Sequence, residues 1–294
     1  MGKFAKPEKQ ASSVIKALQS AGAISSFRTA NNYQEALTRV CEYVKDQKLG
    51  SLRDLTPEQA VVYLEMRGDE IGQKALDQEK HAIQIMMQHL TGKLATTERL
   101  PSVESEFQQI LSSRSYTREQ VEIVASAQRD TNALSTQIAH AAGLRGHELL
   151  TLRRADERAA SPRNTRDERF AGRDGDRYTV KGKGGLVREV LIPKHLSQKL
   201  EALRLDTPQR VVDRKISYSQ HYAINGGQRW ANSFSQAAKR SLFWSAGAHG
   251  LRHSYAQERM HELQKSGFTR VLALELVSQE MGHFRPWITE TYLR

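Results

Sequence analysis

Cysteine is nearly missing from this chain of 294 residues, which contains only Cys41. One cysteine cannot form an intramolecular disulfide, and its scarcity fits a reducing compartment. Cys41 lies on a helical stripe of apolar residues, together with Leu37, Val40 and Val44. We therefore predict that Cys41 is a small core residue and not a reactive thiol.

Long apolar runs are missing as well. No stretch approaches the roughly 18 consecutive apolar residues that cross a membrane. The first ten residues are polar and contain lysine, with no apolar run behind them, which argues against a secretory signal. The sequence also contains no internal repeat and no low-complexity tract. These absences predict a soluble, cytoplasmic protein that does not bind to a membrane by a spanning helix.

Acidic residues are in deficit. The chain has 44 Lys and Arg against 33 Asp and Glu, a formal net charge of +11. This excess favours a polyanionic partner such as nucleic acid or an anionic membrane surface, although a highly charged solvated surface would have the same composition. Residues 1–105 hold 14 basic and 13 acidic residues, a net charge of +1, and the remainder holds 30 and 20, a net charge of +10. Most of the attraction for a polyanion is therefore expected in the second part.

The length suffices for two ordinary domains, each with its own core. Residues 1–100 have the pattern of helices joined by short turns. The motif Thr56-Pro57-Glu58-Gln59 predicts a helix start, Gly68 predicts its end, and a second helix is expected from about Lys74 to Leu90. Between Thr91 and Arg114 the apolar periodicity fades, so residues 101–114 are predicted to form a linker.

Residues 115–294 are predicted to form the second domain. Thr117 and Gln120 indicate a capping box, and a helical stretch follows from about Ala133 to Arg153. The highly charged segment from Ala155 to Asp176 predicts a mobile loop. Two β-rich runs, Arg177 to Val180 and Val187 to Ile192, predict a hairpin, and mainly helix is expected from Gln228 onward. The predicted fold class is therefore mainly α with a small β-hairpin (α+β).

Two cationic side chains in this domain are candidates for binding phosphate. Arg145 lies in the predicted helix Gly143 to Leu150, and its guanidinium offers a rigid fork of donors to phosphate oxygens. A surface pair with Glu148 explains the same arginine equally well. Lys183 lies at the tip of the predicted hairpin between glycines and could reach a leaving oxygen, or it could simply be a solvated turn residue.

Three further candidates lie near the C-terminus. His249 and Arg252 are three residues apart, so on a helix beginning near His249 both side chains would face one phosphate. A partly buried histidine with an exposed arginine is the alternative interpretation. His253 is expected to be structural. His283 follows Gly282, a predicted helix terminator, which would leave its ring at the mouth of the same site.

Tyr292 is the candidate nucleophile. A phenol ordinarily has a pKa near 10, so it needs neighbouring positive charge and a base to act at neutral pH. The two arginines, the lysine and the two histidines could supply both.

The ordered series Arg145, Lys183, His249-x-x-Arg252, Gly282-His283 and Tyr292 resembles the tyrosine recombinases, and among them the integrases of prophages and mobile elements. In that family an Arg lies in a Gly-Leu-Arg-x-x-Glu-Leu helix and a Lys in a Gly-Lys-Gly β-hairpin. A His-x-Leu-Arg-His helix then precedes a Gly-His pair, and a Tyr follows that pair after eight intervening residues. The resemblance covers the chain, since the helical region with Thr29 to Tyr33 is similar to the SAM-like core-binding domain of the family.

The resemblance implies a DNA-binding domain over residues 1–100 and a catalytic domain over 115–294, acting on double-stranded DNA without a cofactor or metal. It also implies cleavage and rejoining through a 3′-phosphotyrosyl link at Tyr292, self-association as dimers or tetramers on DNA, and a nucleoid-associated location. Arg145, Arg252 and His283 would stabilise the phosphoryl oxygens, His249 would handle the proton of the tyrosine, and Lys183 would protonate the leaving 5′ oxygen. Two alternatives share part of this set: a type IB topoisomerase-like enzyme, and a DNA-binding protein without catalysis.

Two departures from the family pattern are visible. Only Leu293 and Arg294 follow Tyr292, where family members usually continue into a helix that docks on a neighbouring subunit. The charged loop before the hairpin is also longer than usual in the family, and the family pattern gives it no role.

Overall fold

The computed structural model describes residues 4–106 and 112–294, without the side chain of Lys183. The chain divides into two compact units, Met1–Ile110 and Leu111–Arg294. Each unit contains its own buried apolar cluster, and the two are described separately below.

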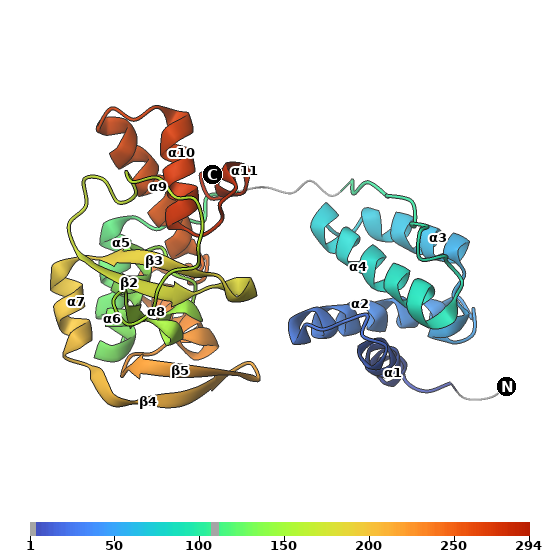
Figure 1. Cartoon of the computed structure of the whole chain (residues 1–294). Helices are drawn as coiled ribbons and strands as arrows, with labels where there is room; N and C mark the ends of the chain where they lie inside the picture. The colour runs from blue at the N-terminus through green and yellow to red at the C-terminus, as the bar shows by residue number, and fades with distance from the viewer. Residues whose placement is uncertain (1–3, 107–111) are drawn as a thin grey trace. The chain divides into compact units, whose positions relative to one another are not determined.

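The first unit is helical (Figure 1). Its core includes Leu37, Val40, Cys41 and Val44, all at most 1% exposed, so the prediction for Cys41 is confirmed. The predicted capping box is also present, since Thr56 and Gln59 each accept the backbone N–H of the other. Its elements are α1 (Pro7–Ser20), α2 (Phe27–Asp46), a short 3-10 turn (Leu52–Asp54), α3 (Pro57–Gly68), α4 (Gln73–Met86) and a π turn (Met87–Thr91).

The second unit combines helices with two small antiparallel sheets. The first sheet has the order β1-β2-β3, and the second is the hairpin β4-β5. Its helices are α5 (Arg118–Ser126), α6 (Asp130–Ala141), α7 (Lys194–Glu201), α8 (Gly227–Leu242), α9 (Gly250–Lys265), α10 (Arg270–Glu280) and α11 (Pro286–Glu290). Its strands are β1 (Arg153–Arg154), β2 (Asp176–Lys181), β3 (Val187–Ile192), β4 (Arg204–Asp213) and β5 (Ile216–Tyr222), with 3-10 turns at Glu148–Thr151 and Lys183–Gly185.

The fold is therefore mainly α with small sheets, as the sequence predicts. The capping box at Thr117 and Gln120 opens α5, and the predicted hairpin is formed by β2 and β3. One apolar cluster joins α5, α6 and α8 to the sheet β1-β2-β3, and another joins α9 to α10. No helix among the described residues is both long and apolar enough to span a bilayer.

The helix predicted from Ala133 to Arg153 is wrong in its second half. Helix α6 ends at Ala141, and residues 143–147 form a turn before the 3-10 segment and β1. Gly143 has a φ of +59°, outside the helical region, and a methyl group on it would lie 2.7 Å from the ring of Tyr255. Arg145 therefore lies on a turn, where its backbone N–H donates to the carboxylate of Glu148.

The segment from Ala155 to Asp176 is anchored, contrary to the prediction of a mobile loop. Arg158 donates to the carbonyl oxygens of Thr151 and Thr179, and the backbone N–H of Phe170 donates to Glu280. Arg173 forms a two-pronged ion pair with Glu262. These contacts join residues distant in sequence, so local composition could not reveal them.

The hairpin β4-β5 was not predicted. One of its faces, with Arg210, Val212, Ser217 and Ser219, is exposed, and its register is irregular between Arg204 and Gln209. The sequence therefore lacks the regular apolar alternation that indicates a strand.

Candidate active site

A buried carboxylate holds three guanidiniums together in the second unit. Glu148 is 0% exposed, and its Oε1 accepts the side chain of Arg145 at 2.8 Å. Its Oε2 accepts Arg188 at 2.8 Å and lies 3.9 Å from the guanidinium of Arg252. Arg145 comes from the turn after α6, Arg188 from β3 and Arg252 from α9, so three separate segments converge on one acid.

The electrostatics of this cluster follow from burial and mutual charge. Burial alone would raise the pKa of the Glu148 carboxyl, but the charges of Arg188, Arg252 and Arg145 hold that pKa far below its ordinary value. Burial and the neighbouring Arg145 lower the pKa of Arg252 to about 10. Both groups therefore stay ionised at neutral pH, and the cluster has more positive than negative charge.

Arg252 is held in the first turn of α9. This helix begins at Gly250, where a methyl group would lie 2.3 Å from the carbonyl oxygen of Arg114, so the helix start packs directly on that segment. The guanidinium of Arg252 donates to the carbonyl oxygens of Gly143 and Met281 and contacts Nε2 of His283 at 3.0 Å. Its Nε has no partner. The side chain is therefore fixed from three directions and fully buried.

His283 is neutral and has a defined tautomer. Arginine can only donate, so Nε2 of His283 must accept from Arg252, and Nδ1 then carries the proton that it donates to Oγ1 of Thr289 at 3.0 Å. Burial, followed by the charge of Arg252, lowers the pKa of His283 to about 3. Gly282 has a φ of +73° and terminates α10 as predicted, which turns the His283 ring toward the arginines.

Tyr292 lies over this cluster. Its hydroxyl is 3.3 Å from Nε2 of His249, and its ring is stacked on His283 with centroids 5.0 Å apart. The guanidinium carbon of Arg252 lies 5.6 Å from the centre of the tyrosine ring. The side chain of Gln257 on α9 donates to the carbonyl oxygen of Tyr292, which holds the chain beside that helix.

His249 can accept a proton in this position. The side chain is exposed to solvent, but desolvation by the surrounding protein atoms, followed by the charge of Arg252, lowers its pKa to about 4, so the imidazole is neutral at pH 7. His253 lies one helical turn further along α9, with its ring centroid 4.8 Å from that of Tyr292. Burial and the charge of Arg114 lower the pKa of His253 to about 4, and its Nδ1 has no partner.

Lys183 is placed only through its backbone. The 3-10 turn Lys183–Gly185 joins β2 to β3, and the lysine side chain is outside the described part of the structure. The preceding Gly182 packs beside the cluster, because a methyl group on it would lie 3.1 Å from Oε1 of Glu148 and 3.7 Å from Arg145. The hairpin therefore begins its turn directly next to the arginines.

The structure thus brings Arg145, His249, Arg252, His283 and Tyr292 into one cluster. Two further members, Glu148 and Arg188, were missed as parts of the site. A signal for Arg188 exists, because strand alternation puts it on the same face as the buried Val190 and Ile192. Burying a charge without a partner costs free energy, so a charged residue at an inward strand position predicts a buried partner of opposite charge.

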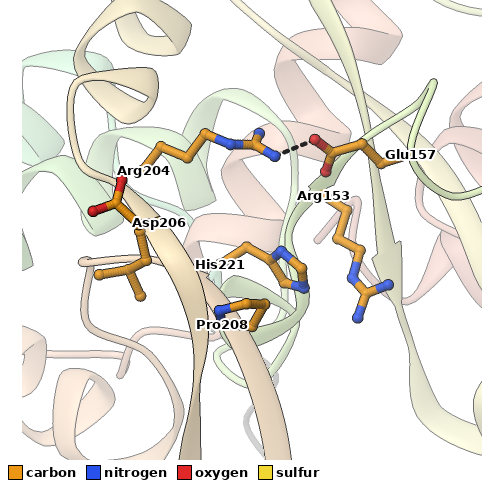
Figure 2. A pocket seen from close by; sticks show the side chains of 7 residues that line it. Arg153, Glu157, Arg204, Asp206, Pro208 and His221 are labelled. Carbon is orange, nitrogen blue, oxygen red and sulfur yellow. Dashed lines mark hydrogen bonds and ion pairs between the residues drawn. The ribbon is translucent and has the colours of Figure 1, made fainter.

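A separate cavity of about 420 Å³ lies beside β1 and the start of β4. Figure 2 shows its lining, with the ring of His221 between Arg153 and Pro208 and an ion pair joining Arg204 to Glu157. None of its lining residues belongs to the cluster around Tyr292 described above. Among the described residues, no group of three or more His, Cys, Asp or Glu is placed to hold a metal ion.

The sequence matches no protein-family model and no curated protein. Solved structures resemble the chain over nearly its whole length. A lambda integrase dimer bound to a core site has a TM-score of 0.60 at 15% identity, covering 97% of this chain and 94% of that one. XerH site-specific recombinase bound to its difH substrate has a TM-score of 0.58 at 16% identity, covering 98% and 81%. The Tn1549 transposon integrase with transposon end DNA has a TM-score of 0.55 at 13% identity, covering 99% and 95%. The chain therefore has the fold of the tyrosine recombinases.

Proposed function

We propose that this chain is a site-specific tyrosine recombinase that cleaves and rejoins duplex DNA through a 3′-phosphotyrosyl intermediate. The observation that carries the proposal is the position of the Tyr292 hydroxyl, 3.3 Å from a neutral His249 and above the buried Arg252. A phenol next to a base and a fixed cation has the surroundings that a nucleophile attacking phosphate requires. The fold shared with recombinases solved on DNA supports the same conclusion.

In the proposed reaction, the Tyr292 oxygen attacks the phosphorus and its proton passes to Nε2 of His249. The bond from phosphorus to the 5′ oxygen breaks, and Lys183 donates a proton to that oxygen to give a 5′-hydroxyl. Arg145 and Arg252 stabilise the negative charge on the phosphoryl oxygens. His283 positions Arg252 through the 3.0 Å contact of its Nε2 with that guanidinium. A 5′-hydroxyl that attacks the phosphotyrosine reverses these steps and reseals the strand.

Glu148 and Arg188 act by positioning. Neither touches the reacting atoms in this proposal. Glu148, held by its ion pair with Arg188, fixes the orientation of Arg145 and lies 3.9 Å from the guanidinium of Arg252. Residues 1–100 would bind the duplex as the core-binding domain, and the basic second unit as the catalytic domain. By analogy with the lambda integrase dimer and tetramer on DNA, we propose that this chain assembles in the same way on paired sites.

The test is the substitution Tyr292→Phe, which removes the nucleophilic oxygen and keeps the ring. On a nicked suicide substrate carrying the cognate site, the wild type becomes covalently attached to DNA, and attachment is detected as a shifted band after denaturing electrophoresis. The variant binds the same DNA with a similar Kd and forms no adduct. A variant that still becomes attached would show that another residue is the nucleophile.

The products distinguish recombination from its closest alternative. A recombinase exchanges strands between two sites, whereas a type IB topoisomerase-like enzyme relaxes supercoiled DNA and needs no second site. A wild type that binds DNA tightly but yields no adduct under any condition would instead be a DNA-binding protein without catalysis.

A further inference from the structure

The turn of the hairpin β4-β5 holds two large cationic residues in an unfavourable backbone conformation. Asp213 and Ile216 are paired across the hairpin, so Arg214 and Lys215 form a two-residue loop. Their φ angles are +48° and +65°, the arrangement of a type I′ turn. Asn-Gly is the sequence that adopts this turn most easily, and side chains such as Arg and Lys disfavour positive φ. The backbone preference of a type I′ turn alone therefore does not explain this choice of residues.

The turn is fixed in direction by the start of α8. The carboxylate of Asp213 accepts the backbone N–H of Gln228 at 2.8 Å and also accepts Nε of Arg214 at 3.0 Å. A methyl group on Gly227 would lie 2.5 Å from the carboxyl carbon of Asp213, so the turn and the helix start are in direct contact. Arg214 is still 45% exposed, and Lys215 is exposed as well.

The same helix start is connected to the turn that carries Arg145. The backbone N–H of Gly227 donates to the carbonyl oxygen of Gly146 at 2.7 Å. On the inner face of the hairpin, the ring of Tyr218 lies 6.4 Å from that of His147. The tip of β4-β5 is therefore held beside Arg145 by a short series of backbone and carboxylate contacts. In Figure 1, the turns of β2-β3 and β4-β5 point to the same side of the second unit.

We infer that Arg214 and Lys215 form a second phosphate-binding element, which contacts the DNA backbone next to the phosphate held by Arg145 and Arg252. This inference rests on the proposed function. Each DNA strand presents a phosphate about every 3.4 Å along the helix axis, so a strand seated on the arginine cluster presents further phosphates to a neighbouring cationic turn. Asp213, Arg214 and Lys215 together have a formal net charge of +1. These contacts contribute affinity and register and do not depend on base sequence.

The turn allows its charges to be removed while its conformation is kept. The double substitution Arg214→Asn with Lys215→Gly installs the preferred type I′ residues, so its Tm should be no lower than that of the wild type. We expect its Kd for a mixed-sequence duplex to rise by about tenfold, and the slope of log Kd against log salt to fall by about one to two. Affinity is measured by fluorescence anisotropy on the full chain.

Two matched variants complete the experiment. The exchange Arg214→Lys with Lys215→Arg keeps both charges and should bind like the wild type. The pair Lys194→Gln with Lys199→Gln also removes two exposed charges, but on α7, which joins β3 to β4 at the ends opposite the two turns. That pair should change Kd by less than the double turn variant does.

The possible outcomes distinguish this inference from the proposed function. A folded Asn-Gly variant that binds as tightly as the wild type overturns the inference alone, as does an equal loss in the α7 control. A wild type that binds no duplex at any salt concentration overturns the proposed function together with the inference.

Discussion

At the scale of single residues, the site is organised by one acid, Glu148. Three guanidiniums gathered in a buried place repel one another, and without a carboxylate each would bear an uncompensated desolvation cost. Glu148 offsets this cost while leaving the cluster with a net positive charge, which the proposed reaction would use to bind a phosphate. Desolvation, together with the charge of the same cations, lowers the pKa of the neighbouring His249 and His283 and keeps both rings neutral.

The buried His253 should make the stability of the second unit depend on pH. Its pKa is about 4 in the folded chain and about 6.5 when unfolded, so between these values the unfolded chain binds a proton that the folded chain does not. Stability is therefore full above pH 6.5 and is lost as pH falls toward 4. We expect His253→Gln to lose about 2 kcal/mol less than the wild type between pH 7.5 and 4.5.

This prediction can be checked by urea unfolding followed by tryptophan fluorescence, because Trp230, Trp244 and Trp287 all lie in the second unit. The control is His261→Gln, which changes an exposed histidine on the same helix. Equal pH dependence in the wild type and in His253→Gln would contradict the assignment of the loss to His253.

At the scale of elements, the turn after α6 positions the arginine cluster. Gly143 ends the helix with a positive φ, and its carbonyl oxygen accepts from both Arg252 and Arg188. Its Cα faces the ring of Tyr255, so the position tolerates neither a side chain nor a different backbone conformation. The arginine cluster therefore depends on the absence of a single methyl group.

The substitution Gly143→Ala tests this dependence. It combines an unfavourable φ of +59° with a Cβ placed 2.7 Å from Tyr255, and we expect it to destabilise the second unit by about 3 kcal/mol and to reduce covalent attachment to DNA. Gly172→Ala is the matched control, since Gly172 has a φ of +76° with no atom within 4 Å of the added methyl group. It should cost only about 1 kcal/mol in thermal unfolding. Similar losses in both variants would mean that the contact with Tyr255 is unimportant.

Elements that depend on local chemistry were predictable from the sequence. The capping boxes at Thr56 and Thr117 involve residues three positions apart, and the glycine turn between β2 and β3 is equally local. The turn at Gly143 was mistaken for helix because its shape is imposed by Tyr255, more than 100 residues away in sequence. The anchored loop likewise depends on distant partners, whereas the hairpin β4-β5 is local but lacks the apolar alternation that indicates a strand.

The candidate site was predictable from the order of its motifs, and its internal connections were not. Five of the six candidate side chains meet in one cluster, while the side chain of Lys183 is outside the described residues. Glu148 was considered only as a surface partner of Arg145, since nothing local indicates that Arg188 and Arg252 approach the same carboxylate.

At the scale of the whole molecule, charge is divided unevenly between the units. Residues 1–110 hold 14 basic and 14 acidic residues, so their net charge is zero, whereas residues 111–294 hold 30 and 19, a net charge of +11. Long-range attraction for a polyanion therefore comes from the second unit.

We expect the salt dependence of DNA binding to follow this division. A fragment of residues 112–294 should keep most of the slope of log Kd against log salt shown by the full chain, because counterion release follows the number of phosphates neutralised. A fragment of residues 1–106 should show a much shallower slope. Anisotropy titrations over a range of salt concentrations measure both slopes. A steeper slope for residues 1–106 than for residues 112–294 would contradict the assignment.

The contact between Tyr292 and His249 lies within one polypeptide, and Gln257 ties that end of the chain to the helix that carries Arg252. If Tyr292 is the nucleophile proposed above, its hydroxyl and the neighbouring imidazole would therefore come from one and the same copy. In that case, an assembly of several copies on DNA would serve to align partner strands and to time the exchange, and would not need to supply the nucleophile from a neighbouring copy.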